Sequence, residues 1–297
     1  MLNIKKFNVR LSAVFVSMVV LFITVFSLSS SKADAGDLTL SYKVYNATTG
    51  SYLRQYNLTV EGNNTRAVIG TDEREVDYSK NGVVKLIIYD ITRGKTDIGS
   101  GFVVDDHTIA TAAHCVKNKT IKSILFFDQD GNNCMTITDP VEYHYPTKYE
   151  NRSEYHYYDY ALITVKQSLN DYRCFNLGMV IKEFENKTTN VVSASGFPEE
   201  VRGVKVNTVD HHELYRGTGH ITNLVDKNTG YVDLINYDAD ISVGDSGGPV
   251  YVAEHENNKM YYTVIGINVR DTGVINVGTA ISPTVLKFLK GNTNKNY

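Results

Sequence analysis

The sequence predicts an all-β protein of the barrel or sandwich class that ends in one short helix. Val, Ile and Thr are common and there are 21 tyrosines among 297 residues; such β-branched and aromatic residues favour strands. About a dozen short apolar runs recur between Gly, Asn and Asp breakers, with no helical periodicity between them. Many short strands at close spacing are typical of these two architectures.

Clear strand signals begin with the apolar run Val-Val-Lys-Leu-Ile-Ile-Tyr at residue 83. Before it, residues 36–66 are polar and carry only weak strand patterning, at Leu38–Val44 and Tyr56–Val60. The later expected strands are Gly101–Val104, Thr108–Ala112, Ser123–Phe127, Met135–Thr138, Tyr160–Val165, Val191–Gly196, Val204–Val209, His220–Val225, Tyr231–Ile235, Pro249–Val252, Tyr261–Val269 and Val277–Ile281.

The last element has the signals of a helix. Ser282 is a good N-cap, Pro283 suits the first helical position, and Gly291 follows the apolar stretch as a stop signal. Ser before Pro at the start and Gly past the end is the usual asymmetry of helix ends. We expect a short C-terminal helix here.

Composition limits the possible partners. Apolar residues make up 42% and charged residues 21%, which is ordinary for a globular protein. The net charge is only −3 and there is no long basic run, so nucleic acid is not an expected partner. The segment 128–132 lacks the distal Glu of a calcium loop, and adjacent His211 and His212 would face opposite sides of a strand. No metal or other cofactor is therefore predicted.

The first 35 residues have the pattern of an export signal. Basic residues precede a long apolar stretch, Leu11–Leu28, and Ala33-Asp34-Ala35 has the small-x-small form of a signal peptidase site. We predict a signal peptide over residues 1–35 and a secreted, monomeric protein without stable membrane association after cleavage. An uncleaved anchor is the alternative, since the stretch is nearly long enough to span a bilayer.

Three cysteines, Cys115, Cys134 and Cys174, are too few for a disulfide scaffold. One bridge with a free thiol and no bridge at all both remain open. A catalytic cysteine is not expected, because Cys115 and its neighbour His114 would point to opposite faces of a strand.

The string Gly244-Asp245-Ser246-Gly247-Gly248-Pro249 is the strongest functional signal. Hydrolysis of a peptide bond needs an activated nucleophile and donors for the developing oxyanion. Glycines permit a tight turn on which a Ser hydroxyl is presented beside converging backbone N–H groups. We assign Ser246 as the nucleophile and the amides of Gly244 and Ser246 as the oxyanion hole.

Two further segments supply the base and its partner. His114 follows small residues at the end of an apolar strand, and an imidazole suits general-base catalysis. Asp159 directly precedes a buried strand, where its charge needs a partner. Holding the imidazole N–H of His114 would be such a role, so we predict a triad of His114, Asp159 and Ser246.

These three segments together resemble the chymotrypsin-like serine proteases, in which the triad occurs in the same order. Within that superfamily the chain is similar to the secreted glutamyl endopeptidases of Gram-positive bacteria, from about residue 67 to 291. The residues that carry this narrower resemblance are Val68–Arg74, Tyr237–Asp240, Val264–Ile267 and Gly278–Ala280, with the short helix after them.

The resemblance implies two six-stranded antiparallel β-barrels with the active site between them. His114 and Asp159 would belong to an N-terminal barrel, residues 68–180, and Ser246 to a C-terminal barrel with the terminal helix, residues 181–297. It also implies a zymogen whose propeptide, residues 36–67, is removed after Arg66 or Ala67. The new N-terminal amine would then pair with Asp245.

The specificity residues depart from the glutamyl endopeptidase pattern. Asn268 and Ile241 occupy positions where that family is expected to carry a His and a Ser or Thr, so glutamate preference is not carried over. Asp240 lies six residues before Ser246, where trypsin-like enzymes bind Lys or Arg. Basic, acidic and other preferences therefore remain open.

The expected function is that of a secreted serine endopeptidase acting on protein or peptide substrates through an acyl-enzyme. The alternative is a catalytically silent homologue that serves as a binding or adhesion module.

Overall fold

The structure is a computed structural model that describes residues 38–45, 52–60, 72–79, 81–150, 155–172, 175–183, 191–226, 231–256, 258–271 and 275–291. The expected signal peptide, the expected cut at Arg66 or Ala67, and Cys174 lie outside these residues. Within the described part of the chain, no helix has the length and apolar character needed to cross a membrane.

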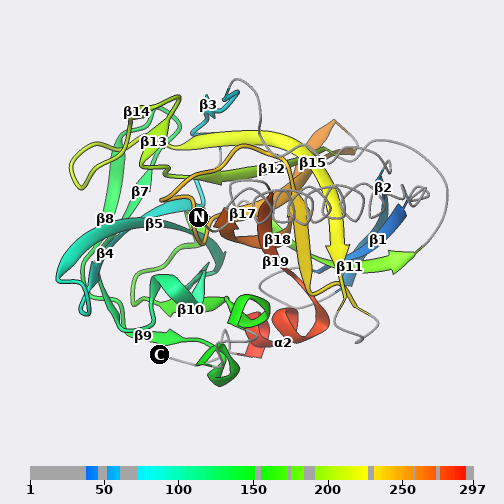
Figure 1. Cartoon of the computed structure of the whole chain (residues 1–297), viewed down its shortest axis with the longest axis horizontal. Coiled ribbons are helices and arrows are strands. Elements are labelled where there is room, and N and C mark those ends of the chain that lie inside the picture. The colour runs from blue at the N-terminus through cyan, green and yellow to red at the C-terminus, as the bar shows by residue number, and fades with distance from the viewer. Residues whose placement is uncertain are drawn as a thin grey trace, which may run out of the picture. The chain divides into compact units, whose positions relative to one another are not determined.

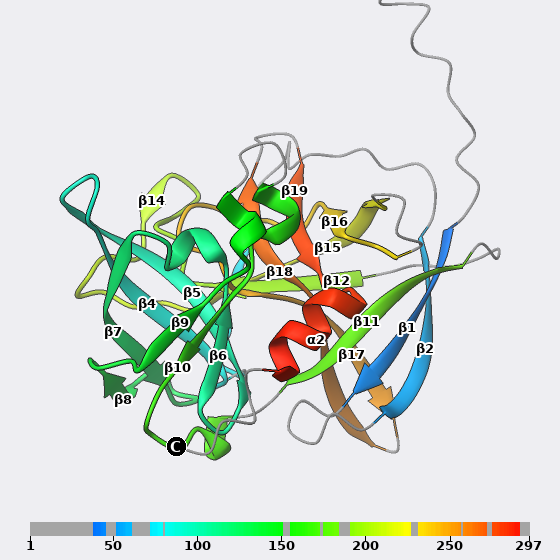
Figure 2. The same ribbon diagram turned by 90° about the horizontal axis from the view of Figure 1, so that it is seen from below.

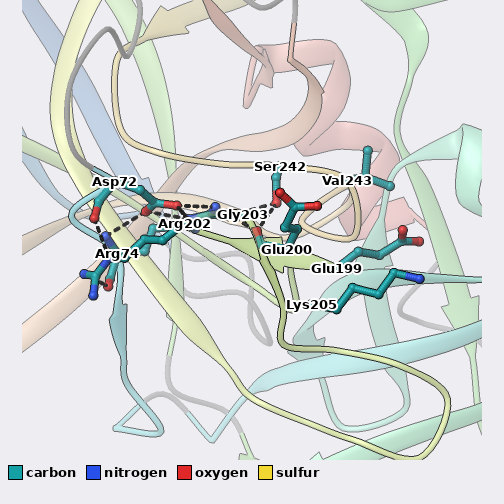
Figure 3. Close-up of a pocket in the computed structure, with 9 residues that line it drawn as sticks. All are labelled: Asp72, Arg74, Glu199, Glu200, Arg202, Gly203, Lys205, Ser242 and Val243. Atoms are coloured by element: carbon teal, nitrogen blue, oxygen red, sulfur yellow. Dashed lines mark hydrogen bonds and ion pairs between the residues drawn. The ribbon is translucent and has the colours of Figure 1, made fainter.

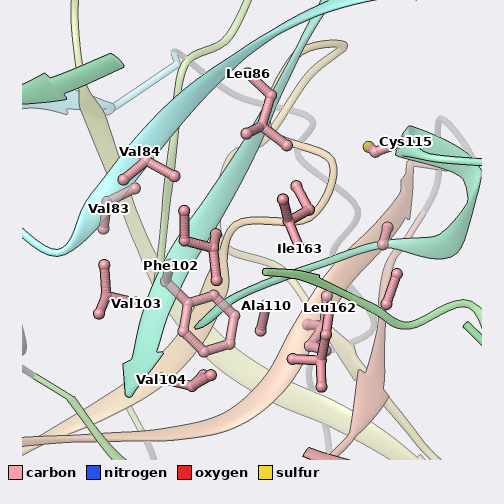
Figure 4. Close-up of a cluster of buried hydrophobic side chains, with 14 of the residues drawn as sticks. Val83, Val84, Leu86, Phe102, Val103, Val104, Ala110, Cys115, Leu162 and Ile163 are labelled. Carbon is pink, nitrogen blue, oxygen red and sulfur yellow. The ribbon is translucent and has the colours of Figure 1, made fainter. Parts of the chain in front are cut away.

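Residues 83–164 contain a seven-stranded antiparallel sheet with the order β8-β7-β4-β5-β6-β10-β9 (Figure 1). Most of the largest apolar cluster of the described residues lies on this sheet, and the cluster continues into the C-terminal half of the chain. Figure 4 draws part of it, with Phe102 among the fully buried side chains. Burying one such side chain contributes about 1.5–3 kcal/mol. The strands are β4 (Val83–Asp90), β5 (Lys95–Asp105), β6 (Thr108–Thr111), β7 (Lys119–Phe127), β8 (Asn133–Ile137), β9 (Glu142–His144) and β10 (Ala161–Thr164).

The C-terminal half contains a closed six-stranded barrel. Its strands follow the order β17-β12-β15-β16-β19-β18, and pairing of β17 with β18 closes the ring, with every neighbour antiparallel. A second apolar cluster fills this barrel. The strands are β12 (Val191–Gly196), β15 (Tyr215–Val225), β16 (Leu234–Tyr237), β17 (Pro249–Glu256), β18 (Lys259–Asp271) and β19 (Asn276–Ala280).

Four more strands extend the barrel sheet. β11 (Phe175–Glu183) pairs in parallel with β18, and β1 (Leu38–Tyr45) and β2 (Tyr52–Val60) form an antiparallel hairpin that pairs with β11 (Figure 2). The short β3 (Glu75–Val76) pairs with β15. Residues expected as a propeptide thus supply β1 and β2, and the expected barrel boundary at residue 180 falls inside β11.

Short elements complete the chain. The terminal helix α2 (Pro283–Gly291) is confirmed with its cap: Ser282 Oγ accepts the N–H of Val285 at 3.4 Å, as an N-cap does. The other elements are the 3₁₀ turns η1 (Ala113–Cys115), η2 (Thr147–Glu150), η3 (Tyr155–Tyr158) and η4 (Asn170–Tyr172), and the small hairpin of β13 (Glu200–Val201) and β14 (Val204–Lys205).

The predicted all-β, two-barrel fold with a C-terminal helix is therefore confirmed. One barrel closes with six strands, and the other is an open sheet of seven strands. The strand expected at Val204–Val209 is wrong beyond Lys205: the following residues turn back so that Thr208 N donates to His211 O at 3.1 Å.

Candidate active site

The pairing of β6 with β10 brings two predicted site residues together. Ala161 on β10 lies opposite Thr111 on β6. Asp159 comes just before β10 and His114 just after β6, so both lie at the same end of this strand pair. His114 is not on a strand end as expected but in the 3₁₀ turn η1.

Asp159 holds His114 with both carboxylate oxygens. Oδ1 accepts the backbone N–H of His114 at 2.9 Å, and Oδ2 lies 2.8 Å from its Nδ1. The carboxylate is 4% exposed and the imidazole 31%. This contact places the proton on Nδ1 and leaves Nε2 free to accept a proton.

The pKa of His114 is raised well above its ordinary value. Burial lowers it, because an imidazolium loses solvent, but the nearby charge of Asp159 and its hydrogen bond outweigh that effect. Cys115 also raises it, because the turn brings the thiol near the ring rather than to an opposite face, as a strand would. The buried Cys115 thiol donates to Ser246 O at 3.6 Å, and Cys115 and Cys134 are both free thiols.

The loop that carries Ser246 packs against the ends of β5 and β6. Ser100 N donates to Ser246 O at 2.8 Å. Gly247 has φ +86°, and a Cβ there would overlap Thr111 Oγ1 and lie 2.9 Å from Ala112 N. Only glycine allows this close approach, which brings Ser246 to the segment that leads into His114.

The second link of the predicted triad is not closed. Among the described residues, no hydrogen bond joins Ser246 Oγ to the His114 ring. Such bonds are often long without substrate and shorten in the complex. The structure therefore brings His114 and Asp159 into contact and holds the backbone of Ser246 beside Cys115, without a hydrogen bond from Ser246 Oγ to the His114 ring.

Gly244 is held in a conformation that favours glycine. Its φ is +100°, a Cβ would overlap Phe197 O, and its carbonyl accepts the Ser100 hydroxyl at 2.8 Å. Within the described part of the chain, the N–H groups of Gly244 and Ser246 have no hydrogen-bond acceptor. These two predicted oxyanion donors are thus available to a ligand.

Asp245 is buried beside Ser246 and already has a cationic partner. Its Oδ2 accepts Ser242 N–H at 2.8 Å and lies 3.3 Å from Nη1 of Arg74. Burial raises the pKa of Asp245 to about 7, while Arg74 and the Ser242 N–H oppose the rise. In this uncut chain, a guanidinium occupies the place expected for a new N-terminal amine.

The three predicted specificity residues differ in their surroundings. Asp240 Oδ2 accepts the N–H of Glu73 at 2.8 Å, and burial raises the pKa of Asp240. Asn268 is buried; its Oδ1 accepts the Tyr237 hydroxyl at 2.9 Å and its Nδ2 donates to Asp245 O at 3.0 Å. Ile241 packs against the apolar cluster of the closed barrel.

Sequence reasoning missed Lys85, which is fully buried on β4. Its Nζ donates to Asn207 Oδ1 at 3.2 Å and to the carbonyls of Thr208 and His211, each at 2.7 Å, and lies 3.0 Å from His212 Nδ1. Burial lowers the pKa of Lys85 to about 8. A single Lys within an apolar run is the signal that could have revealed it.

No cluster of three or more His, Cys, Asp or Glu side chains suited to a metal ion occurs in the described residues. His211 and His212 lie instead at the Lys85 contact, where Phe127 also packs against the His212 ring.

Comparison with known families decides the classification. Residues 99–258, just over half of the chain, match the Trypsin-like peptidase domain. The chain belongs to the trypsin-like peptidase family. The match includes His114, Asp159 and Ser246. The narrower resemblance to glutamyl endopeptidases stays a prediction.

Two solved structures of inactivated protease paralogues share this fold. The scabies mite inactivated protease paralogue S-I1 aligns with a TM-score of 0.52 and 16% identity over 76% of this chain and 100% of that one. Its paralogue S-D1 aligns with a TM-score of 0.51 and 13% identity, over 77% of this chain and 99% of that one. The active form of the Rv3671c protease from M. tuberculosis aligns with a TM-score of 0.46 and 17% identity, over 73% of this chain and 83% of that one. A comparison with curated proteins gave no match.

Proposed function

We propose that this member of the trypsin-like peptidase family is a secreted serine endopeptidase that uses His114, Asp159 and Ser246. The observation that carries the proposal is the two-point contact of Asp159 with His114, at 2.9 and 2.8 Å. A carboxylate that fixes both the backbone and the ring of one histidine gives the imidazole a single orientation.

The mechanism follows from these positions. Nε2 of His114 takes the hydroxyl proton of Ser246 as its oxygen attacks the scissile carbonyl carbon. The oxyanion that forms accepts the N–H groups of Gly244 and Ser246. The imidazolium is stabilised by Asp159 and returns its proton to the leaving amine. Water then cleaves the acyl-enzyme by the same steps.

Labelling with a fluorophosphonate tests this proposal, because the reagent reacts with an activated serine. We expect Ser246 to be labelled, and Ser246→Ala to abolish the labelling. Ser168→Ala is the matched control, since Ser168 lies on an exposed turn that contacts Asp106. Absence of labelling in the correctly folded wild-type protein would refute the proposal.

A catalytically silent homologue that binds proteins is the second candidate. The observation in its favour is the missing hydrogen bond between Ser246 Oγ and the His114 ring. The labelling experiment distinguishes the two candidates. A binding module would not react with the fluorophosphonate even as the wild type, and Ser246→Ala would leave both its fold and its binding to a partner unchanged.

For specificity we propose cleavage after Lys or Arg, recognised by Asp240. Burial raises the pKa of Asp240, and the charges of Asp72 and Glu73 raise it further, while the Glu73 N–H and the charge of Arg74 lower it. The two neighbouring carboxylates would favour an added cation. Glutamate preference is not proposed, because both polar atoms of Asn268 are engaged and Ile241 is apolar.

Export and maturation are part of the same proposal. The signal peptide over residues 1–35 directs secretion of a monomer, and the chain is cut after Arg66 or Ala67. Sequencing the N-terminus of the secreted protein tests both statements, and an N-terminus before residue 36 would contradict the first.

A further inference from the structure

The side chain of Arg74 joins several segments behind the Ser246 loop. It is 6% exposed. Nη1 donates to Ser242 Oγ at 2.9 Å and lies 3.3 Å from Asp245 Oδ2, while Nη2 donates to Glu200 O at 2.8 Å. Figure 3 shows Arg74 beside Ser242 and Glu200 at the rim of a pocket of about 410 Å³.

A second carboxylate, that of Asp72, fixes the orientation of the Arg74 guanidinium that contacts Asp245. Asp72 accepts Nε of Arg74 at 3.0 Å and Nη2 at 2.7 Å, the bidentate geometry that suits arginine. Asp72 is itself fixed, because the backbone N–H of Arg202 donates to its Oδ2 at 3.1 Å. Burial raises the pKa of Asp72, but these bonds to Arg74 and Arg202 lower it to about 2.

The loop that Arg74 reaches contains the proposed oxyanion donors. Asp245 is 3% exposed, directly precedes Ser246 and accepts the Ser242 N–H, so its carboxylate ties both ends of the segment 242–246 together. Gly244 lies inside this segment. A buried carboxylate that loses its cation is strongly unfavourable. Without Arg74, Asp245 would either take up a proton or move toward solvent, and in both cases the ionised contacts that hold the loop would be lost.

We propose that Arg74 is a positioning residue for the oxyanion hole, and that its guanidinium replaces a released N-terminal amine as the partner of Asp245. This inference rests on the proposed function and deepens it. The guanidinium already has four partners in the unprocessed chain: Asp72, Ser242, Glu200 and Asp245. Because Asp245 already pairs with this cation before any cut, the loop needs no released amine to neutralise its buried carboxylate.

Arg74→Ala tests the inference through the rate of fluorophosphonate labelling and through peptide hydrolysis. We expect kcat/KM to fall about 100-fold, mainly in kcat, because substrate binding does not depend on the oxyanion donors. Arg93→Ala is the matched control: Arg93 also pairs with two aspartates, Asp90 and Asp97, but it is half exposed, and within the described part of the chain none of its hydrogen bonds reaches the segment 242–246. It should retain the wild-type rate.

Chemical rescue separates positioning from general destabilisation. The pocket beside Arg74 opens to solvent, so guanidinium ion, below the concentration that unfolds the protein, should restore part of the activity of Arg74→Ala and none in Ser246→Ala. Arg74→Lys, which keeps the charge but not the bidentate geometry, should fall between wild type and Arg74→Ala.

The unprocessed chain gives a test that does not depend on the folding of a variant. We expect the purified unprocessed protein to be labelled at a rate similar to that of the processed form. The inference would be overturned if only the processed form were labelled, or if Arg74→Ala were fully active. If no wild-type form is labelled, the proposed function itself fails.

Discussion

Asp159→Asn is the substitution that most directly tests the proposed base. Asn can still accept the backbone N–H of His114, but its NH₂ group would face Nδ1. The ring would then carry its proton on Nε2 and could not accept the proton of Ser246. Asp159 Oδ2 lies 2.8 Å from His114 Nδ1. At an effective dielectric constant of about 20, the attraction between the carboxylate and the imidazolium, which the substitution removes, is at most about 6 kcal/mol. That limit agrees with a fall in kcat of about 10⁴-fold.

The pH dependence gives the same test a second readout. Because the base must be neutral and Asp159 raises the pKa of His114 well above 6.5, wild-type kcat/KM should rise with pH through a value above 6.5. In Asp159→Asn, burial still lowers the pKa of His114, and the carboxylate charge that raised it is gone. The residual kcat/KM should therefore rise with pH through a lower value than in the wild type. Rates of peptide hydrolysis across the pH range measure both effects. If the pH at which kcat/KM rises stayed the same in Asp159→Asn, or if kcat fell only slightly, the role of Asp159 would be refuted. Asp106→Asn is the control: Asp106 pairs with His107 at an exposed site, so this substitution should change neither kcat nor the pH profile.

Three further substitutions test other parts of the structure. Gly247→Ala should lower the free energy of unfolding, measured in urea, by about 2–4 kcal/mol and abolish labelling. Gly94 also has a positive φ but open space around it, so Gly94→Ala should lower it by about 1 kcal/mol. Equal losses of stability would contradict the packing of the Ser246 loop. Lys85→Met leaves three oxygen acceptors without their donor and should destabilise by about 2–4 kcal/mol, while exposed Lys95→Met should be neutral. Asp240→Asn should reduce cleavage after Lys and Arg about 100-fold in a peptide library, and an unchanged cleavage profile would remove Asp240 from the specificity site.

Local sequence signals were sufficient wherever one segment determines its own structure. Val191–Gly196 was predicted as a strand with the bounds that the structure gives, and Ser282, Pro283 and Gly291 marked the helix correctly. The contact of Asp159 with His114 could also be anticipated, because a carboxylate at the start of a buried strand requires a partner. The turn at His114 was missed, since its small neighbours Ala112 and Ala113 fit either a strand or a 3₁₀ turn.

Contacts between distant segments could not be read in this way. Arg74 and Asp245 are 171 residues apart, and Lys85 lies 122 residues from Asn207. A Lys in an apolar run or an Arg in a polar segment has no local signal that names its partner. Pairing depends on how the sheets fold, which also explains why the weak pattern of residues 38–60 did not reveal a hairpin added to β11.

The hairpin of β1 and β2 has a consequence for what maturation would release. β1 matches β11 over seven residue pairs, from Thr39 opposite Glu183 to Tyr45 opposite Leu177. A cut after Arg66 severs one covalent link but none of these ladder bonds, so the excised piece would stay docked until the strands separate. Once it leaves, β11 presents a row of unpaired main-chain groups to water. An extended peptide or another copy of this chain could pair with that exposed edge.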